Sequence, residues 1–400
     1  MRAYTQQLTV EQFGGMVATA SRIVGSHRGP YIGYTPTGSP LPVRFDPSQA
    51  PREDRASAVL LIGTLGSGKT VAAQTIEYAA ERRGSVVVDF DPKPDHGLHT
   101  LPELAGRLQV LELSGAESQQ GRLDPLAIGL PDLREELAVS YLLELLPGNP
   151  AQWENAISLA VKDTVREGSR GLLRVADLLL TSDRPGAKDA GEALQVIRDF
   201  GLARLGFGNG ETGAAEAQSP VTTIRMPGLS LPDPAAGRES YTRAERVSVA
   251  TLSLVAAYAL QLISGDRSTH KVVGLDEIWF LLASPQGRQI IHRLVRLGRA
   301  FNATLLLGTH RIADLGDLAE LIGVVFVFGQ DSDAGAEAAL RFIGLPPTPD
   351  LIAKVREFRA GHCLMRDLQG RVGEVQIDLV YPHLLQALMT TPSQPERSEQ

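Results

Sequence analysis

The stretch Gly63-Thr64-Leu65-Gly66-Ser67-Gly68-Lys69-Thr70 matches the phosphate-binding pattern G-x-x-x-x-G-K-[ST]. The apolar segment before it, Ala58 to Ile62, is expected to form a buried strand, and Val71 to Arg83 a helix. Backbone N–H groups from Gly63 to Val71 can then surround nucleotide phosphates, Lys69 can reach the β- and γ-phosphate oxygens, and the Thr70 hydroxyl can bind Mg²⁺. The stretch therefore predicts a site for ATP and Mg²⁺ rather than a chance glycine-rich turn.

A second motif lies far along the chain, at Lys271-Val272-Val273-Gly274-Leu275-Asp276-Glu277. It is a short apolar run that ends in two adjacent carboxylates, which is the Walker B arrangement. Asp276 is expected to hold Mg²⁺ through water, and Glu277 to act as the general base that polarises the attacking water. The alternative is a strand that ends in a solvated Asp-Glu turn.

Composition fits a soluble enzyme. The chain has 400 residues, of which 43% are hydrophobic and 21% charged, enough for one large α/β domain plus a smaller one. The net charge of −7 gives no global attraction to nucleic acid. It leaves local DNA contact through a basic loop possible. The one cysteine, Cys363, excludes an internal disulfide framework.

No targeting segment stands out. The N-terminus lacks the apolar core of a signal peptide, and the most apolar helix, Val247 to Ile263, is short for a membrane span and contains serines and a threonine. We therefore expect a cytoplasmic protein without a transmembrane segment, or one that is peripheral to a membrane complex.

Strand and helix patterns divide the chain into segments. Alternating strands and helices predict an α/β fold with a mostly parallel sheet, covered on both faces, in 57–130 and 220–390. Residues 1–56 are expected to form short strands and turns that pack on this domain. Residues 131–219 are predicted to be an all-α insertion that ends in a mobile loop, and 391–400 a disordered tail.

Within the insertion, apolar residues recur at helical spacing in four segments. The predicted helices are Glu135 to Leu146, Gln152 to Arg166, Leu173 to Leu180 and Lys188 to Leu205. The segment Gly208 to Pro220 is rich in Gly, Ala, Glu and Ser and is the expected mobile loop.

Three further side chains are candidates for chemistry. Arg299, or else Arg296, follows a basic helix and could reach the active site of a neighbouring subunit as an arginine finger, although such a face is often merely solvated. His310 follows the predicted strand Thr304 to Leu307, where a polar group could sense hydrolysis; a lone histidine is otherwise usually structural.

The segment after the second core strand carries Lys93, with Asp91, Asp95, His96 and His99 around it. The position of Lys93 near the active edge of the sheet allows a structural or a subunit-contact role, or a solvated loop. The two histidines and two aspartates could suggest a metal cluster, but their spacing fits no metal site that we can justify.

The order of these motifs resembles the VirB/TraC-type ATPases of type IV secretion and conjugation. The residues that carry the resemblance extend over nearly the whole chain: Tyr31-Ile32-Gly33-Tyr34, Pro42-Val43-Arg44-Phe45-Asp46, the phosphate loop, Asp91-Pro92-Lys93, Leu123-Asp124-Pro125-Leu126, Asp276-Glu277-Ile278-Trp279 and Arg296-Leu297-Gly298-Arg299. The resemblance extends to the HerA and FtsK translocases and the conjugative coupling proteins. Where the family usually has Gln after Thr, this chain has Thr309-His310.

The resemblance implies a RecA-like P-loop domain with an α-helical insertion. It further implies a homo-hexamer on the cytoplasmic side of a secretion machine, with the other secretion components as partners. ATP hydrolysis would power assembly or substrate transfer, with Lys69, Thr70, Asp276 and Glu277 acting in one subunit and Arg299 across the interface.

Two other functions remain open. A DNA-translocating motor of the coupling-protein or HerA/FtsK type predicts hydrolysis that DNA stimulates strongly and DNA binding that weakens with salt. A nucleotide-gated assembly scaffold predicts ring formation with ATP and negligible phosphate release.

Overall fold

The structure is a computed structural model, which describes residues 23–148, 150–211, 218–233 and 237–389. The predicted disordered tail 391–400, the beginning of the 1–56 segment and the centre of the predicted mobile loop lie outside the described residues.

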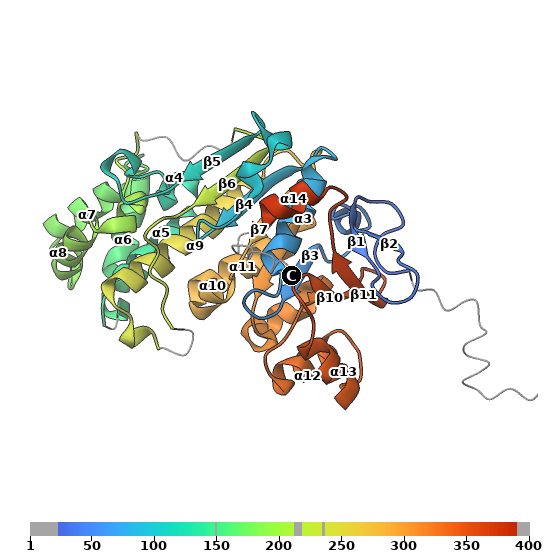
Figure 1. Ribbon diagram of the computed structural model, residues 1–400. Coiled ribbons are helices and arrows are strands. Elements are labelled where there is room, and N and C mark those ends of the chain that lie inside the picture. The colour runs from blue at the N-terminus through green and yellow to red at the C-terminus, as the bar shows by residue number, and fades with distance from the viewer. Residues whose placement is uncertain (1–22, 149, 212–217, 234–236, 390–400) are drawn as a thin grey trace, which may run out of the picture.

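An eleven-stranded sheet runs through the chain in the order β2-β1-β11-β10-β9-β3-β8-β7-β4-β6-β5 (Figure 1). Every neighbouring pair from β9 to β5 is parallel, and every pair from β9 to β2 is antiparallel. The predicted α/β fold class with a mostly parallel sheet is therefore confirmed. The strands are β1 Tyr31–Tyr34, β2 Pro42–Arg44, β3 Ala58–Ile62, β4 Val86–Asp91, β5 Leu108–Glu112, β6 Val221–Arg225, β7 Lys271–Leu275, β8 Ala303–Thr309, β9 Ile322–Val327, β10 His362–Arg366 and β11 Val372–Ile377.

Helices cover both faces of the sheet. The side chains of the central strands, which alternate between the two faces, are therefore buried on both sides. In β3, Leu60 belongs to the core on the face covered by α9 (Arg243–Ile263) and α11 (Pro285–Gly298), whereas Leu61 belongs to the core under α3 (Lys69–Glu81). The first core carries on into the helical segment after β5, so it is the larger of the two.

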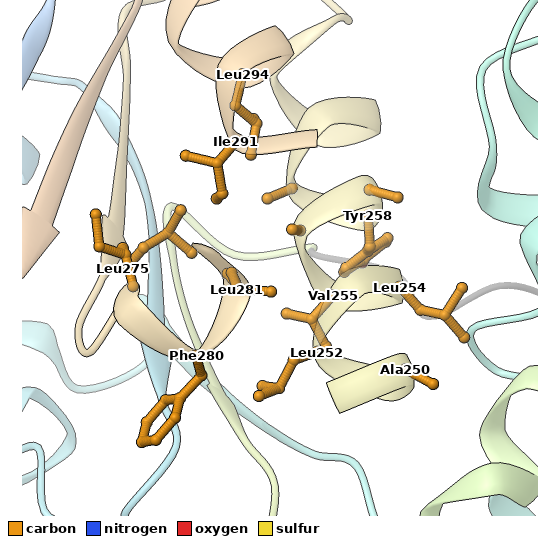
Figure 2. Close-up of a cluster of buried hydrophobic side chains, with 14 of the residues drawn as sticks. Ala250, Leu252, Leu254, Val255, Tyr258, Leu275, Phe280, Leu281, Ile291 and Leu294 are labelled. Atoms are coloured by element: carbon orange, nitrogen blue, oxygen red, sulfur yellow. The ribbon is translucent and has the colours of Figure 1, made fainter. Parts of the chain in front are cut away.

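Helix α9 joins the sheet to that helical segment. It begins with a capping box in which Thr242 and Glu245 satisfy each other's backbone N–H groups. In Figure 2, Leu252 and Val255 of α9 face the side on which Leu275, Leu281 and Ile291 lie. Among the described residues α9 is the helix long and apolar enough to cross a membrane, but 83% of its apolar window is buried inside the fold. It is the central core helix of this structure (Figure 1, yellow).

Between β5 and β6 the described residues form helices and no strand. They are η3 Glu117–Gln119, α4 Pro125–Ile128, α5 Arg134–Leu145, η4 Pro150–Trp153, α6 Glu154–Arg166, α7 Leu172–Thr181, α8 Ala187–Ile197 and η5 Gly201–Gly206. The prediction of one helix from Lys188 to Leu205 is wrong. Helix α8 ends at Ile197, and Gly201 then adopts a left-handed φ of 51° that an α-helix does not allow.

Short helices connect the remaining strands, and several were not predicted. Helices α12 and α13, which follow β9 in the chain, lie side by side (Figure 1), and α14 packs on α3. The elements are α2 Gln49–Arg52, η1 Leu98–Thr100, η2 Pro102–Leu104, η6 Arg238–Ser240, α10 Trp279–Ala283, η7 Ile312–Leu321, α12 Asp333–Phe342, α13 Pro349–Arg356 and α14 Pro382–Leu388.

One buried carboxylate holds three parts of the helical segment together. Asp124 Oδ1 accepts the Leu126 N–H at the start of α4 at 2.9 Å. Its Oδ2 accepts the N–H of Leu172, where α7 begins, at 2.8 Å and that of Gly208 at 2.7 Å. Burial raises the pKa of Asp124 to about 7, although these three N–H groups act in the opposite direction.

Substituting Asp124→Ala is expected to lower the free energy of unfolding by about 3 kcal/mol or more, since three buried N–H groups lose their acceptor at about 1–3 kcal/mol each. Urea denaturation measures the loss. The exposed Asp177→Ala on α7 is the control and should change stability by less than about 0.5 kcal/mol. Equal stabilities of the two variants would contradict the assignment.

Candidate active site

The phosphate loop has the conformation that its glycines permit. Gly66 and Gly68 both have left-handed φ values, of 74° and 99°. A Cβ on Gly68 would lie 2.5 Å from the backbone nitrogen of Gly361, whose N–H donates to the Ser67 carbonyl at 2.9 Å. The loop is thus seated on the turn before β10, and α3 begins directly after it with its N-terminus at the loop.

Lys69 is a buried cation whose hydrogen bonds, within the described residues, go to carbonyl groups. Its Nζ donates to the carbonyls of Gly63 at 2.8 Å and Thr64 at 3.0 Å, and 7% of the residue is exposed. Burial lowers the pKa of Lys69, while the carboxylates of Asp276 and Glu277 oppose that shift. Carbonyl dipoles alone compensate a buried charge poorly. The site therefore fits an anion such as a nucleotide phosphate.

Asp276 and Thr70 meet at the point where the sequence places Mg²⁺. The Thr70 hydroxyl donates to Asp276 Oδ2 at 2.9 Å, and the Glu277 N–H donates to Asp276 Oδ1 at 3.0 Å. Burial would raise the pKa of Asp276, but hydrogen bonding and the nearby positive groups His96 and Lys69 hold it well below its usual range. An ionised carboxylate beside a hydroxyl is an oxygen donor set that suits Mg²⁺.

Glu277 has a strained backbone and a fully engaged side chain. Its φ is 60°, a left-handed value that non-glycine residues rarely adopt. Lys93 Nζ lies 2.5 Å from Oε1, while His310 Nε2 and Trp279 Nε1 lie 2.9 Å and 3.0 Å from Oε2. Burial would raise the pKa of Glu277, but hydrogen bonds from His310 and Lys93 lower it to about 2. The carboxylate is therefore ionised, as a general base must be.

His310 connects the two motifs. One ring nitrogen contacts Glu277, and the other, Nδ1, lies 3.0 Å from the carbonyl of Gly63 at the start of the phosphate loop. The predicted site residues Lys69, Thr70, Asp276 and Glu277 therefore lie together with His310 at the carboxyl ends of neighbouring strands. The roles assigned to them stay predictions.

The loop after β4 supplies two contacts that the sequence patterns did not show. Lys93 reaches Glu277, and His96 Nε2 lies 3.8 Å from Asp276 Oδ2. Asp91 holds this loop: its side chain accepts the N–H groups of Asp95 and His96 and pairs with Arg225 at 2.9 Å.

The alternative of a metal cluster in this loop has some geometric basis. Ligand atoms of Asp91, Asp95 and His96 all lie within 4.8 Å of one another. Both oxygens of Asp91 are already engaged by the loop and by Arg225, however, and His99 contacts Arg225 instead of joining the group. These residues are better explained as the framework of the loop.

The two candidate finger arginines lie away from this site. Arg299 pairs with Asp54 at 3.1 Å, before the amino end of β3. It precedes β8 and so lies at the opposite edge of the sheet, about 20 Å from the carboxyl ends by strand length. Arg296 lines a groove of about 760 Å³ with Glu136 of α5. Either arginine could reach a phosphate only in a neighbouring chain, and the finger role stays a prediction.

The missed contacts of Lys93 and His96 have a common cause, whereas the contact of Trp279 is local, two residues from Glu277. β4 pairs with β7 in the sheet, so the ends of these two strands are adjacent although nearly two hundred residues separate them in sequence. The Asp-Pro-Lys run directly after a strand was the available sequence signal. It does not indicate which strand lies next to β4 in the sheet.

The fold and this site define a P-loop ATPase domain. The family model described as AAA-like domain matches residues 50–388, and the chain belongs to that family. The structure is similar to that of VirB4 of Thermoanaerobacter pseudethanolicus, with a TM-score of 0.71 and 17% identity over 92% of this chain and 100% of that one. The resemblance stated from the sequence motifs is thereby confirmed, as is the RecA-like P-loop fold.

Two further proteins are similar to this chain. The plasmid coupling protein TrwB in complex with ADP and Mg²⁺ aligns with a TM-score of 0.54 and 13% identity, over 94% of this chain and 93% of that one. The uncharacterized protein YddE of Bacillus subtilis (strain 168) is 22% identical over 280 residues, which are 68% of this chain and 33% of YddE. The chain thus spans about a third of the length of that curated relative.

Gly308, in β8, gives a test of the site geometry. A Cβ there would lie 2.2 Å from Asp276 Oδ1, so Gly308→Ala is expected to displace the carboxylate from Thr70 and lower the ATP hydrolysis rate at least about tenfold. The control is Gly265→Ala, whose Cβ would meet the Leu262 carbonyl at 3.8 Å. Steady-state phosphate release measures both. Full activity of Gly308→Ala would show that Asp276 need not occupy this position.

Proposed function

We propose that this chain hydrolyses ATP in the presence of Mg²⁺ and that the hydrolysis powers a type IV secretion or conjugative DNA-transfer machine. The single observation that carries the proposal of ATP hydrolysis is the position of Glu277. Its ionised carboxylate is joined through His310 to the same phosphate loop that holds Lys69. The proposed role in a secretion or conjugation machine is supported by similarity to VirB4 and to a plasmid coupling protein.

Each side chain has a defined task in this proposal. Lys69 and the N–H groups of residues 63–71 bind the phosphates, and Thr70 and Asp276 hold Mg²⁺, which would neutralise phosphate charge when bound. Glu277 orients water and accepts its proton, and His310 keeps the Glu277 carboxylate aimed at the phosphate loop. The complex of TrwB with ADP and Mg²⁺ supports the choice of ligands.

The assembly is part of the same proposal. Arg299, or else Arg296, acts on the nucleotide of a neighbouring subunit in a homo-hexamer, because neither lies near the site of its own chain. Residues 57–130 and 220–390 form the ATPase domain, and 131–219 an inserted helical unit. Such a ring would be cytoplasmic and peripheral to a membrane complex, with other secretion components as partners.

A DNA-translocating role is the second candidate. Arg288, Arg293 and Arg296 are exposed on α11 and line one side of the groove of about 760 Å³. Although the net charge of the chain is −7, this local basic face could contact phosphates of DNA. Hydrolysis that DNA stimulates strongly would favour this role over one directed only at the protein machinery.

Substituting Glu277→Gln tests the catalytic proposal. The amide keeps the size of the side chain but cannot accept a proton, so turnover should fall by about 10²–10⁴-fold while ATP still binds. Phosphate release and fluorescent-nucleotide binding measure the two effects. The control is Glu320→Gln, an exposed residue of η7, which should leave both unchanged. Undiminished hydrolysis by Glu277→Gln would remove Glu277 from the base role.

A further inference from the structure

His96 is a buried histidine placed between two carboxylates. Only 4% of it is exposed. Its Nδ1 lies 2.7 Å from Asp89 Oδ1, and its Nε2 lies 3.8 Å from Asp276 Oδ2. That Nε2 is buried and makes no hydrogen bond within the described residues, which is costly for a polar atom in a core. The unused nitrogen points to a partner at the Asp276 end.

His96 is held both at the Nδ1 atom of its ring and at its backbone. Asp89 lies within β4, and its second oxygen accepts the hydroxyl of Thr223 in β6 at 3.1 Å. The His96 N–H donates to Asp91 Oδ2 at 3.2 Å, and Arg225 donates to the His96 carbonyl at 3.0 Å. These contacts all come from β4 and β6, so His96 is tied to the parallel part of the sheet.

The space around the ring is almost closed. A cavity of about 10 Å³ is lined by Lys69, Glu77, Asp89, His96 and Asp276, among others. That volume is near the lower limit for one water molecule. Of the two carboxylates near Nε2, that of Asp276 is the nearer, at 3.8 Å, and the half-exposed Asp95 lies at 4.0 Å.

We propose that His96 is a positioning residue for the Mg²⁺ site. Braced by Asp89, it fixes the orientation of the Asp276 carboxylate, while Thr70 holds the same carboxylate from the phosphate loop. Loss of an outer partner of a metal-binding carboxylate lowers metal affinity by about 10–100-fold. The inference rests on the proposed Mg²⁺–nucleotide site.

The test compares the affinity for a fluorescent ADP analogue in Mg²⁺ with that in EDTA. In the wild-type chain Mg²⁺ should tighten binding. In His96→Gln we expect the affinity in EDTA to stay unchanged and the gain from Mg²⁺ to shrink by about tenfold or more. His99→Gln is the matched control, since His99 is an exposed histidine of the same segment that contacts Arg225 rather than Asp276.

The outcomes separate this inference from the proposed function. If Mg²⁺ does not tighten binding in the wild-type chain, the proposed Mg²⁺ site itself fails. If it does, an unchanged gain in His96→Gln overturns the positioning role. Equal losses with Mg²⁺ and with EDTA would show that His96 only stabilises the fold, which also overturns it.

A second variant covers the case in which His96→Gln fails to fold, as thermal unfolding would reveal. Asp89→Asn keeps the size of the side chain and an oxygen that can accept from His96 Nδ1, but it removes the charge that braces the ring. It should reduce the gain from Mg²⁺ in the same direction, with unchanged affinity in EDTA. An unchanged gain in Asp89→Asn would then overturn the inference.

Discussion

The carboxylate of Glu277 is out of water and ionised, and a buried charge is stable only when it is paired and hydrogen-bonded. The ends of two neighbouring strands supply Lys93, after β4, and His310, after β8, and Trp279 adds a third partner two residues along the chain. Because both strand ends must be in place for Glu277 to be satisfied, they are fixed relative to one another. The same contacts hold a backbone with a φ of 60° in place.

The parallel part of the sheet makes this convergence possible. The strand order β3-β8-β7-β4 brings four carboxyl ends side by side, and each carries one component: the phosphate loop, His310, the two Walker B acids and the Lys93 loop. Gly274 and Gly308 leave the room that the acids and Glu77 need, since a Cβ at either would collide with a carboxylate oxygen. The antiparallel strands and the helical segment lie outside this centre and determine what the domain can contact.

Local patterns were enough to predict the centre of the site. The phosphate loop and the Asp276-Glu277 pair are read from contiguous residues, because strand, glycine turn and helix follow one another in the chain. The contacts of Lys93 and His96 depend on β4 lying next to β7, which contiguous residues do not encode. Apolar spacing alone predicted a helix that continues to Leu205, but α8 ends at Ile197 and Gly201 has a left-handed φ. Helices α12 and α13 were missed although Ser332 and Thr348 cap them.

The most direct test of the account is steady-state ATP hydrolysis by the wild-type chain across protein concentration, with Mg²⁺ or EDTA, and with or without single- and double-stranded DNA. We expect hydrolysis that requires Mg²⁺ and whose rate per chain rises with concentration, because Arg299 or Arg296 must come from a neighbour. The response to DNA then separates a motor directed at protein machinery from a DNA translocase. Nucleotide-dependent assembly with no phosphate release under any of these conditions would contradict the account and leave a nucleotide-gated scaffold.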